Sequence, residues 1–148
     1  MTTIADFYKR LNKVIKEMPT LIKESVKEND DVIIDTITEQ QLQKGIRGDG
    51  QKIGEYKNKD YQKYKKQINP QARGFVDLKL EGDFYKGFVI KEDGNFQTVI
   101  SKDDKAEKLE KKYGSEIYIL TDKNHQKIVK DYILPTLLIN IKNELQLP

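Results

Sequence analysis

Cysteine and tryptophan are absent from the sequence, and histidine occurs once, at His125. Without cysteine the chain has no disulfide, no thiolate ligand for a metal and no cysteine nucleophile. A single histidine excludes a metal site built from several histidines of one chain, and we expect His125 to be exposed or to cap a helix. We therefore expect no enzyme, no metal and no cofactor. A hydrolase built on two carboxylates stays open, because pairing in space is invisible in a sequence.

Long apolar runs are also absent from the sequence. None approaches the roughly 20 residues that a helix needs to cross a bilayer. The N-terminal segment has neither the uninterrupted apolar run nor the cleavage site of a signal peptide. We therefore expect no membrane partner and synthesis in the cytoplasm.

The chain has 148 residues, of which 36% are hydrophobic and 34% are charged. This composition is polar for a compact enzyme and favours a domain that completes its burial against other subunits. We expect a single α+β domain over residues 1–148. Its predicted parts are helices over 1–45, a basic loop or arm over 46–74, a central antiparallel hairpin with a short helix over 75–120, and a proline-kinked C-terminal helix over 121–148.

The N-terminal third of the sequence has helical periodicity. Residues 4–26 carry apolar side chains at spacings of three and four, which is one face of a helix. Pro19 lies inside this pattern and predicts a kink or the start of a second helix. Residues 30–44 are also predicted to be helical, with Thr38 and Gln41 at the spacing of a capping box.

The next segment combines glycines, tyrosines and positive charge. Four glycines within residues 45–54 predict an irregular loop or a tight, protruding ribbon. Residues 56–68 interleave tyrosines with lysines, which is typical either of nucleic-acid contact or of a short helix whose tyrosines pack inward. Residues 44–73 contain nine basic side chains and three acidic ones, an asymmetry that indicates DNA or an acidic partner. The candidate residues for this basic surface are Arg47, Lys52, Lys57, Lys59, Lys63, Lys65, Lys66 and Arg73.

A hairpin is the clearest β signal in the chain. Two apolar, β-branched runs at residues 84–90 and 96–100 flank an Asp-Gly turn. The acidic pair at 103–104 then predicts the cap of a short helix over 105–112, and Gly114 predicts its end.

The C-terminal segment is unusually apolar. Residues 115–120 are predicted to form a short strand, and Thr121 is predicted to cap the last helix, which Pro135 should bend. Apolar side chains cover most of the circumference around Pro135, and such a helix must be buried on nearly all sides. In a domain this small, that predicts a homo-oligomer. The candidate interface residues are Ile133, Leu134, Leu137, Leu138, Ile139 and Ile141.

Several motifs in a fixed order resemble a known group of proteins. A Gln-Leu-x-x-Gly element followed by Asp-Gly, tyrosines and a lysine spans residues 41–65. An Asp-Leu-x-x-Glu-Gly-x-Phe element spans 77–84, with Glu81 where the group has threonine. A Lys…Leu…Lys-Tyr-Gly element spans 105–114, and a helix with Pro135 inside it comes last. This order resembles small phage and prophage proteins of gut bacteria, a group similar to the head–tail joining, neck and tail-completion proteins of tailed phages.

The resemblance implies a structural protein of the virion with no catalytic role. Such proteins assemble as rings between the portal and the tail, so the implied partners are further copies of the chain, neighbouring portal, neck or tail proteins, and DNA that passes without sequence-specific contact. The implied location is the neck or tail region of the virion, after synthesis in the cytoplasm of a bacterial host. Two alternatives stay open: a nucleic-acid-binding module that uses the tyrosine- and lysine-rich segment, and a minor tail or tail-terminator protein.

Overall fold

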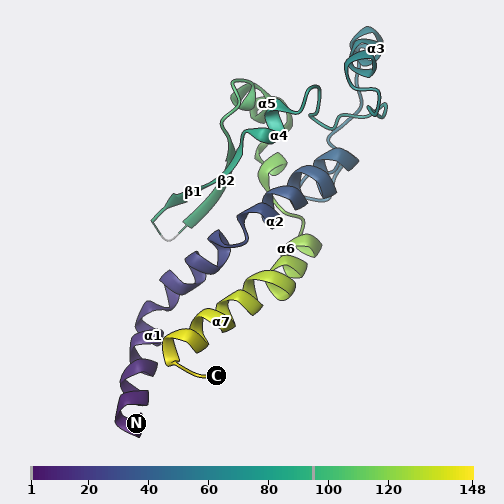
Figure 1. Cartoon of the computed structure of the whole chain (residues 1–148). Helices are drawn as coiled ribbons and strands as arrows, with labels where there is room; N and C mark the ends of the chain where they lie inside the picture. Colours follow the sequence, from purple (N-terminus) through teal and green to yellow (C-terminus); the bar gives the residue numbers. More distant parts are fainter. Residues whose placement is uncertain (1, 95) are drawn as a thin grey trace.

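The computed structural model describes residues 2–94 and 96–148, and it has the predicted α+β architecture. The molecule is elongated (Figure 1). Helices α1 (Ile4–Lys27) and α7 (Leu134–Leu145) run side by side toward one end, and helix α3 (Lys59–Ile68) stands at the other. These two ends expose different kinds of surface.

Helix α1 begins at a capping box. The Thr3 hydroxyl accepts a hydrogen bond from the Asp6 N–H at 3.1 Å, and the Asp6 carboxylate accepts one from the Thr3 N–H at 3.0 Å. The helix continues through Pro19, so the alternative that a second helix begins there is wrong. Pro19 has no N–H and leaves the carbonyl of Ile15 without its helical partner. Both residues are exposed, so water can bond that carbonyl.

The helical run after α1 extends to Lys44, as predicted. Helix α2 (Asp30–Asp35) passes into a π-helical turn (Thr36–Gln41) and then a 3₁₀ turn (Leu42–Lys44). The predicted capping box is wrong, because Thr38 lies within this run and its hydroxyl donates to the carbonyl four residues earlier at 2.9 Å. Gly45, with φ of +72°, ends the run.

The glycine-rich segment forms a tight ribbon, in which Ile46 and Lys52 pair as an antiparallel bridge. The prediction that this ribbon protrudes is wrong. It packs against residues 116–119, where the Gly48 N–H donates to the Glu116 carbonyl at 2.8 Å. A Cβ at Gly48 would lie 2.4 Å from the carbonyl oxygen of Ile119, so this contact requires glycine.

The predicted hairpin is present as strands β1 (Phe88–Asp93) and β2 (Phe96–Ser101), which pair antiparallel and in register along their whole lengths. Gly94 in the turn has φ of +59°, and Asn95 lies outside the described residues. The predicted first strand begins too early, because the aromatic residues before β1 belong to a short helix, α4 (Asp83–Lys86).

Helix α5 (Ala106–Tyr113) follows the hairpin where the sequence predicts it. The predicted cap by the acidic pair is wrong, because Lys105 is the N-cap residue and no side chain caps the helix; the Asp103 carboxylate accepts instead from the Lys105 N–H at 2.9 Å. Gly114, with φ of +87°, ends the helix as predicted. The predicted strand after it is wrong: residues Ser115–Tyr118 form a 3₁₀ turn. Two successive side chains of this turn are buried, whereas a strand would send them to opposite faces.

The C-terminal helical run begins at Thr121, whose hydroxyl accepts from the N–H three residues later at 3.2 Å. It comprises α6 (Asp122–Ile128), a π-helical turn (Val129–Ile133) and α7. Pro135 stands in the first turn of α7, directly after the π turn. Proline cannot donate to the carbonyl four residues earlier, and the wider π turn makes room for its ring.

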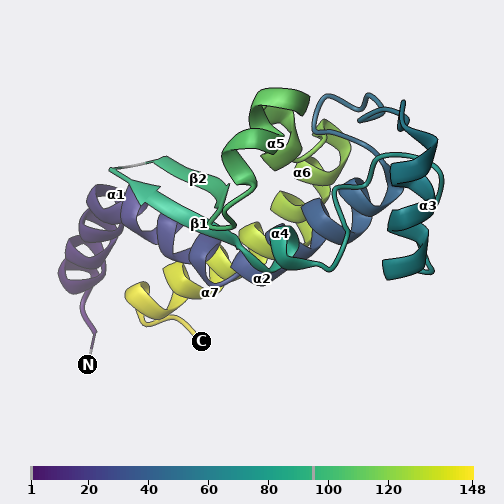
Figure 2. The same cartoon turned by 90° about the horizontal axis from the view of Figure 1, so that it is seen from above.

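Two separate apolar clusters hold the molecule together. The smaller one joins α1 to α7 through Val14, Leu21 and Leu145. The larger one draws its residues mainly from α2, α4, β1, the Ser115–Tyr118 turn and α6, elements whose arrangement Figure 2 shows. Its buried residues are Ile33, Ile37, Leu42, Ile53, Val76, Leu78, Phe84, Phe88, Ile117, Tyr118 and Ile128.

Candidate interaction surfaces

The arm, which we define as residues 55–74, is attached to the main core by a buried lysine. Lys65 of α3 is 2% exposed, and its ammonium donates to the Tyr56 hydroxyl at 2.6 Å and forms an ion pair with the Asp77 carboxylate. The same carboxylate accepts from the Lys79 N–H at 3.0 Å. The prediction that Lys65 faces DNA or a partner is therefore wrong, because this side chain positions the arm.

Two tyrosines complete this buried cluster. The Tyr85 hydroxyl donates to the Asp77 carbonyl, and the ammonium of Lys65 lies 4.9 Å from the centre of the Tyr56 ring. Burial raises the pKa of Tyr56 and Tyr85 far above the usual value, and the Asp77 carboxylate acts in the same direction. Burial therefore favours the protonated form of both hydroxyls, which is the form that donates a hydrogen bond.

The other cations of the arm remain at its surface. Lys59, Lys63 and Lys66 are exposed, and their i, i+4, i+7 spacing puts them on one side of α3, which we call the lysine face. This segment forms the predicted short helix, but its tyrosines do not all pack inward. Tyr64 is 52% exposed and Tyr61 is 42% exposed, as the nucleic-acid interpretation expects. The remaining exposed candidates are Lys52, Lys57 and Arg73.

Arg47 differs from these exposed cations. Its guanidinium forms a 2.7 Å ion pair with Asp49 and donates to the Tyr113 carbonyl at 3.2 Å. Arg47 therefore ties the glycine-rich ribbon to the end of α5, and much of its hydrogen-bonding capacity is used within the chain.

The six apolar candidates of the C-terminal run separate into two groups. Leu137 and Ile141 pack against the α1–α7 cluster, and Ile133 packs against the main core. The structure leaves the other three on the surface, where they stay a predicted interface. Their exposed fractions are 46% for Leu134, 50% for Leu138 and 59% for Ile139.

Helix α1 adds apolar surface that the sequence interpretation assigned to packing. Tyr8, Ile15 and Ile22 follow one another at intervals of seven residues, so they share one face of the helix, and they are 63%, 62% and 43% exposed. Ile4, at 89% exposed, continues this row toward the N-terminus. The seven-residue spacing was visible in the sequence, but periodicity does not say which of two adjacent apolar stripes meets α7.

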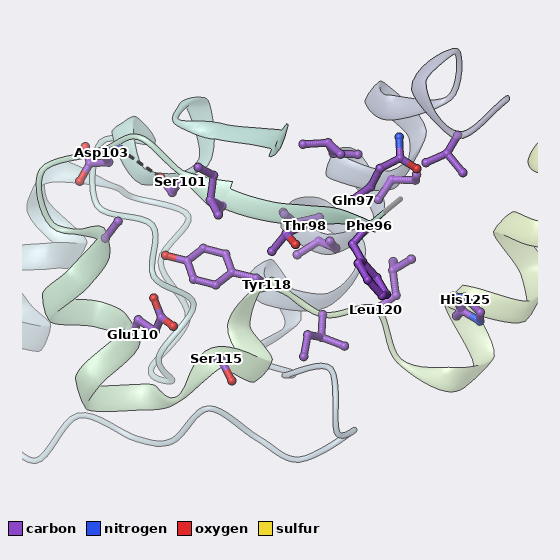
Figure 3. Close-up of a pocket in the computed structure, with 18 of the residues that line it drawn as sticks. Phe96, Gln97, Thr98, Ser101, Asp103, Glu110, Ser115, Tyr118, Leu120 and His125 are labelled. Atoms are coloured by element: carbon purple, nitrogen blue, oxygen red, sulfur yellow. Dashed lines mark hydrogen bonds between the residues drawn. The ribbon is translucent and has the colours of Figure 1, made fainter. Parts of the chain in front are cut away.

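A groove of about 960 Å³ opens between the hairpin, α5, the 3₁₀ turn Ser115–Tyr118 and the start of the C-terminal run (Figure 3). Its floor is apolar and includes Ile37, Val99 and Ile128. At one end Phe96 of β2 is 78% exposed, although its ring lines the groove beside the hairpin tip. A solvent-exposed phenylalanine on the wall of an apolar groove is typical of a surface that another molecule covers.

One wall of the groove is acidic. Asp103, Asp104, Glu107 and Glu110 line it, and among the described lining residues there is no lysine or arginine. We call these four side chains the acidic rim. Burial raises the pKa of Tyr118, at the centre of the groove in Figure 3, to about 12, and the nearby carboxylates of the rim add to the shift.

A buried glutamine fixes the floor of the groove. The Gln41 side chain donates to the Ile119 carbonyl at 2.9 Å, and its oxygen accepts from the Thr121 N–H and from the Asn124 side chain, both at 2.9 Å. It therefore sets where the 3₁₀ turn ends and α6 begins. The sequence gave no signal for this role, because the partners lie about 80 positions away along the chain.

Metal-ligand clusters and membrane-spanning helices are both absent from the described residues. Among them, no three His, Asp or Glu side chains are placed to hold a metal, and His125 is an exposed residue at the edge of the groove (Figure 3). No described helix is both long enough and apolar enough to span a bilayer. Comparison with protein-family models, curated proteins and solved structures finds no match for this chain.

Proposed function

We propose that this protein is a structural subunit of a tailed-phage virion, a head–tail connector or tail-completion protein that assembles as a ring around the path of the DNA. The observation that carries the proposal is the row of exposed apolar side chains on α1 together with those on α7. The elongated chain leaves these large apolar side chains exposed, and a row of them on one helix face is typical of an interface.

The energy available from this surface is large. Fully covering a leucine or isoleucine side chain contributes roughly 1.5–3 kcal/mol. Leu134, Leu138 and Ile139 are about half exposed, so several such residues on each copy supply a substantial driving force for association. Repetition of one contact around a closed ring needs no further partner.

The charge of the arm supports passage of DNA near the ring. The exposed cations of the arm would be repeated in every copy, and repetition turns a modest local charge into a strong field. Contacts from lysine to phosphate carry no sequence information, which suits a duplex that must slide.

The test is the assembly state of the full chain and its presence in particles. We expect rings by electron microscopy, a matching high-mass species by mass photometry, and the chain in purified virions. Leu138→Asp should shift the population to monomers, whereas Lys123→Asp, at an exposed position on α6, should not. A chain that stays monomeric at all concentrations and is absent from virions would contradict the proposal.

A second function, a nucleic-acid-binding module, is favoured by one observation: Tyr61 and Tyr64 are exposed on the same short helix as the lysine face, with ring centres 6.3 Å apart. Aromatic rings next to lysines bind single strands by stacking and phosphate pairing. Here a gel shift should weaken steeply with salt and disappear in the Tyr61→Ala, Tyr64→Ala variant. Absence of any shift at low salt would remove this alternative.

A further inference from the structure

The free edge of strand β2 faces the groove. All six residues of β2, from Phe96 to Ser101, line the groove, whereas β1 contributes only Ile90. Successive side chains of a strand point to opposite faces, and Figure 3 shows Phe96 and Gln97 leaving β2 in opposite directions. A groove that is lined from both faces of a strand runs along its edge. Among the described residues, no other strand pairs with this edge.

The register of the hairpin shows which backbone groups are free at this edge. At the next pair beyond the strands, the Lys102 N–H donates to the Gly87 carbonyl at 2.8 Å, and hydrogen-bonded positions alternate along an antiparallel strand. The N–H and C=O groups of Gln97, Val99 and Ser101 therefore point away from β1. Within the part of the chain that the structure describes, no hydrogen bond joins these backbone groups to another residue. They form a row of unpaired donors and acceptors.

The sequence of β2 has none of the features that protect a free edge. Natural edge strands carry charged residues, proline or a bulge, which prevent pairing with another chain. Strand β1 ends in Lys91, Glu92 and Asp93. Strand β2 has no charged residue, no proline and no glycine, and it pairs with β1 without a bulge. An uncharged, regular edge of this kind is suited to receive a further strand.

We propose that β2 receives an extended segment of another protein as a third strand of the sheet, and that this segment is uncharged and apolar at alternate positions. The backbone groups of Gln97, Val99 and Ser101 bond to the segment, and every second side chain of the segment packs on the apolar floor of the groove. The ring of Phe96, which is 78% exposed, is covered in the same contact. This inference is independent of the proposed ring, which uses the apolar faces of α1 and α7.

The dimensions of the groove fit one strand. Six residues of an antiparallel strand are about 20 Å long, neighbouring strands lie about 4.8 Å apart and a sheet is about 10 Å thick, so an added strand of this length occupies about 1,000 Å³. The groove measures about 960 Å³. A second copy of the chain would bring a hairpin of two strands, which needs about twice that volume. The volume therefore favours a single segment of a partner protein.

The test begins with a display library of random eight-residue peptides, selected on the whole chain. We expect the selected peptides to be uncharged, to lack proline at their central positions and to be apolar at every second position. One selected peptide is then made with capped ends, and its binding is measured by fluorescence anisotropy. Methylation of its backbone nitrogens at alternate residues removes the donors of one edge only. One of the two methylated peptides should therefore bind roughly tenfold more weakly or worse, and the other should keep its affinity.

The protein variants are a matched pair at Gln97. Gln97→Pro removes the N–H that faces the free edge, and proline is tolerated at such a position because the hydrogen bonds to β1 remain. Gln97→Ala keeps this N–H and loses the same side chain, with its 3.3 Å hydrogen bond to the Lys23 carbonyl. The peptide should bind Gln97→Pro roughly tenfold or more weakly than Gln97→Ala. Circular dichroism melting curves identify a variant that fails to fold, and the methylated peptides then test the unchanged chain.

Hydrogen exchange locates the contact. In the unchanged chain, the bound peptide should slow exchange at the N–H groups of Gln97, Val99 and Ser101. Equal binding to the two Gln97 variants, or an equal effect of the two methylations, would show that the occupant does not pair with this edge. A library that yields no binding peptide would also overturn the inference. Self-association that Gln97→Pro abolishes without peptide would assign the edge to a second copy. None of these results bears on the ring, which Leu138→Asp tests separately.

Discussion

At the arm end, a buried ammonium, a carboxylate and two phenols hold α3 in place, whereas at the other end three apolar side chains join α1 to α7. The first arrangement depends on each partner of the cluster, because a buried charge without its partner is costly. The second depends on area and tolerates small losses. The surfaces follow the same division: charged around the arm, apolar along the helix pair. A few polar contacts are enough to fix the direction of α3, whereas joining two long helices needs an extended apolar surface.

The largest effect is expected from breaking the arm cluster. Asp77→Ala leaves the Lys65 ammonium buried without a carboxylate and should lower the free energy of unfolding by about 3–5 kcal/mol. Urea denaturation measures this loss, with Glu81→Ala, at an exposed position nearby, as the control. Adding Lys65→Met to Asp77→Ala should recover part of it, because no charge then remains buried. A loss below about 1 kcal/mol in the single variant would show that Lys65 is solvated.

A smaller effect is expected at the helix pair. Leu21→Ala removes a side chain that is 5% exposed from a cluster with few members, so it should cost about 2–4 kcal/mol. Ile15→Ala, on the exposed face of the same helix, should change the stability of the dilute chain by less than about 0.5 kcal/mol. Hydrogen exchange should then show faster opening of α1 and α7 with unchanged protection of α3. Equal losses of protection at both ends would mean that the two clusters unfold as one unit.

The third prediction concerns the glycine-rich ribbon, which belongs neither to the arm nor to the helix pair. Gly48→Ala drives a methyl group against the Ile119 carbonyl, and we expect a loss of about 1–3 kcal/mol in thermal or urea unfolding. Gly50 has φ of +79° and open space around it, so Gly50→Asn, which tolerates the left-handed conformation, should cost less than about 0.5 kcal/mol. If the two variants are equally stable, the ribbon does not need its close contact with the 3₁₀ turn.

Local patterns predicted the helices and the hairpin, because their signals lie within one stretch of sequence. The spacing of apolar residues predicted α1, and the Asp-Gly turn between two apolar runs predicted β1 and β2. The same reasoning placed α4 in a strand, since an aromatic run has high β propensity. The structure instead packs the Phe84 ring edge-on to Phe88, with ring centres 5.0 Å apart.

The surfaces were less predictable than the elements. Lys65 resembles its neighbours in composition, and only its pairing with Asp77, twelve positions away, removes it from the basic surface. The acidic rim was visible in the sequence as capping residues and as charges of a solvated helix. Its role as the wall of a groove depends on the hairpin that faces it (Figure 3). Sequence patterns fix which face is charged, and tertiary packing decides what that face meets.

The smallest effect is expected at Asp30, the first residue of α2. One oxygen of its carboxylate is buried and has no hydrogen-bond partner, and this burial raises the pKa of Asp30 above its usual value of 3.8. The folded chain therefore holds the proton more tightly than the unfolded chain. This contribution to stability is complete below pH 3.8 and is lost as the pH rises through the higher, folded-state pKa. Asp30→Asn should then be more stable than the unchanged chain at pH 7 and gain nothing at low pH. Asp31→Asn, at an exposed neighbouring position, is the matched control. Melting curves from pH 3 to pH 7 measure the difference, and a gain that does not vary with pH would contradict the assignment.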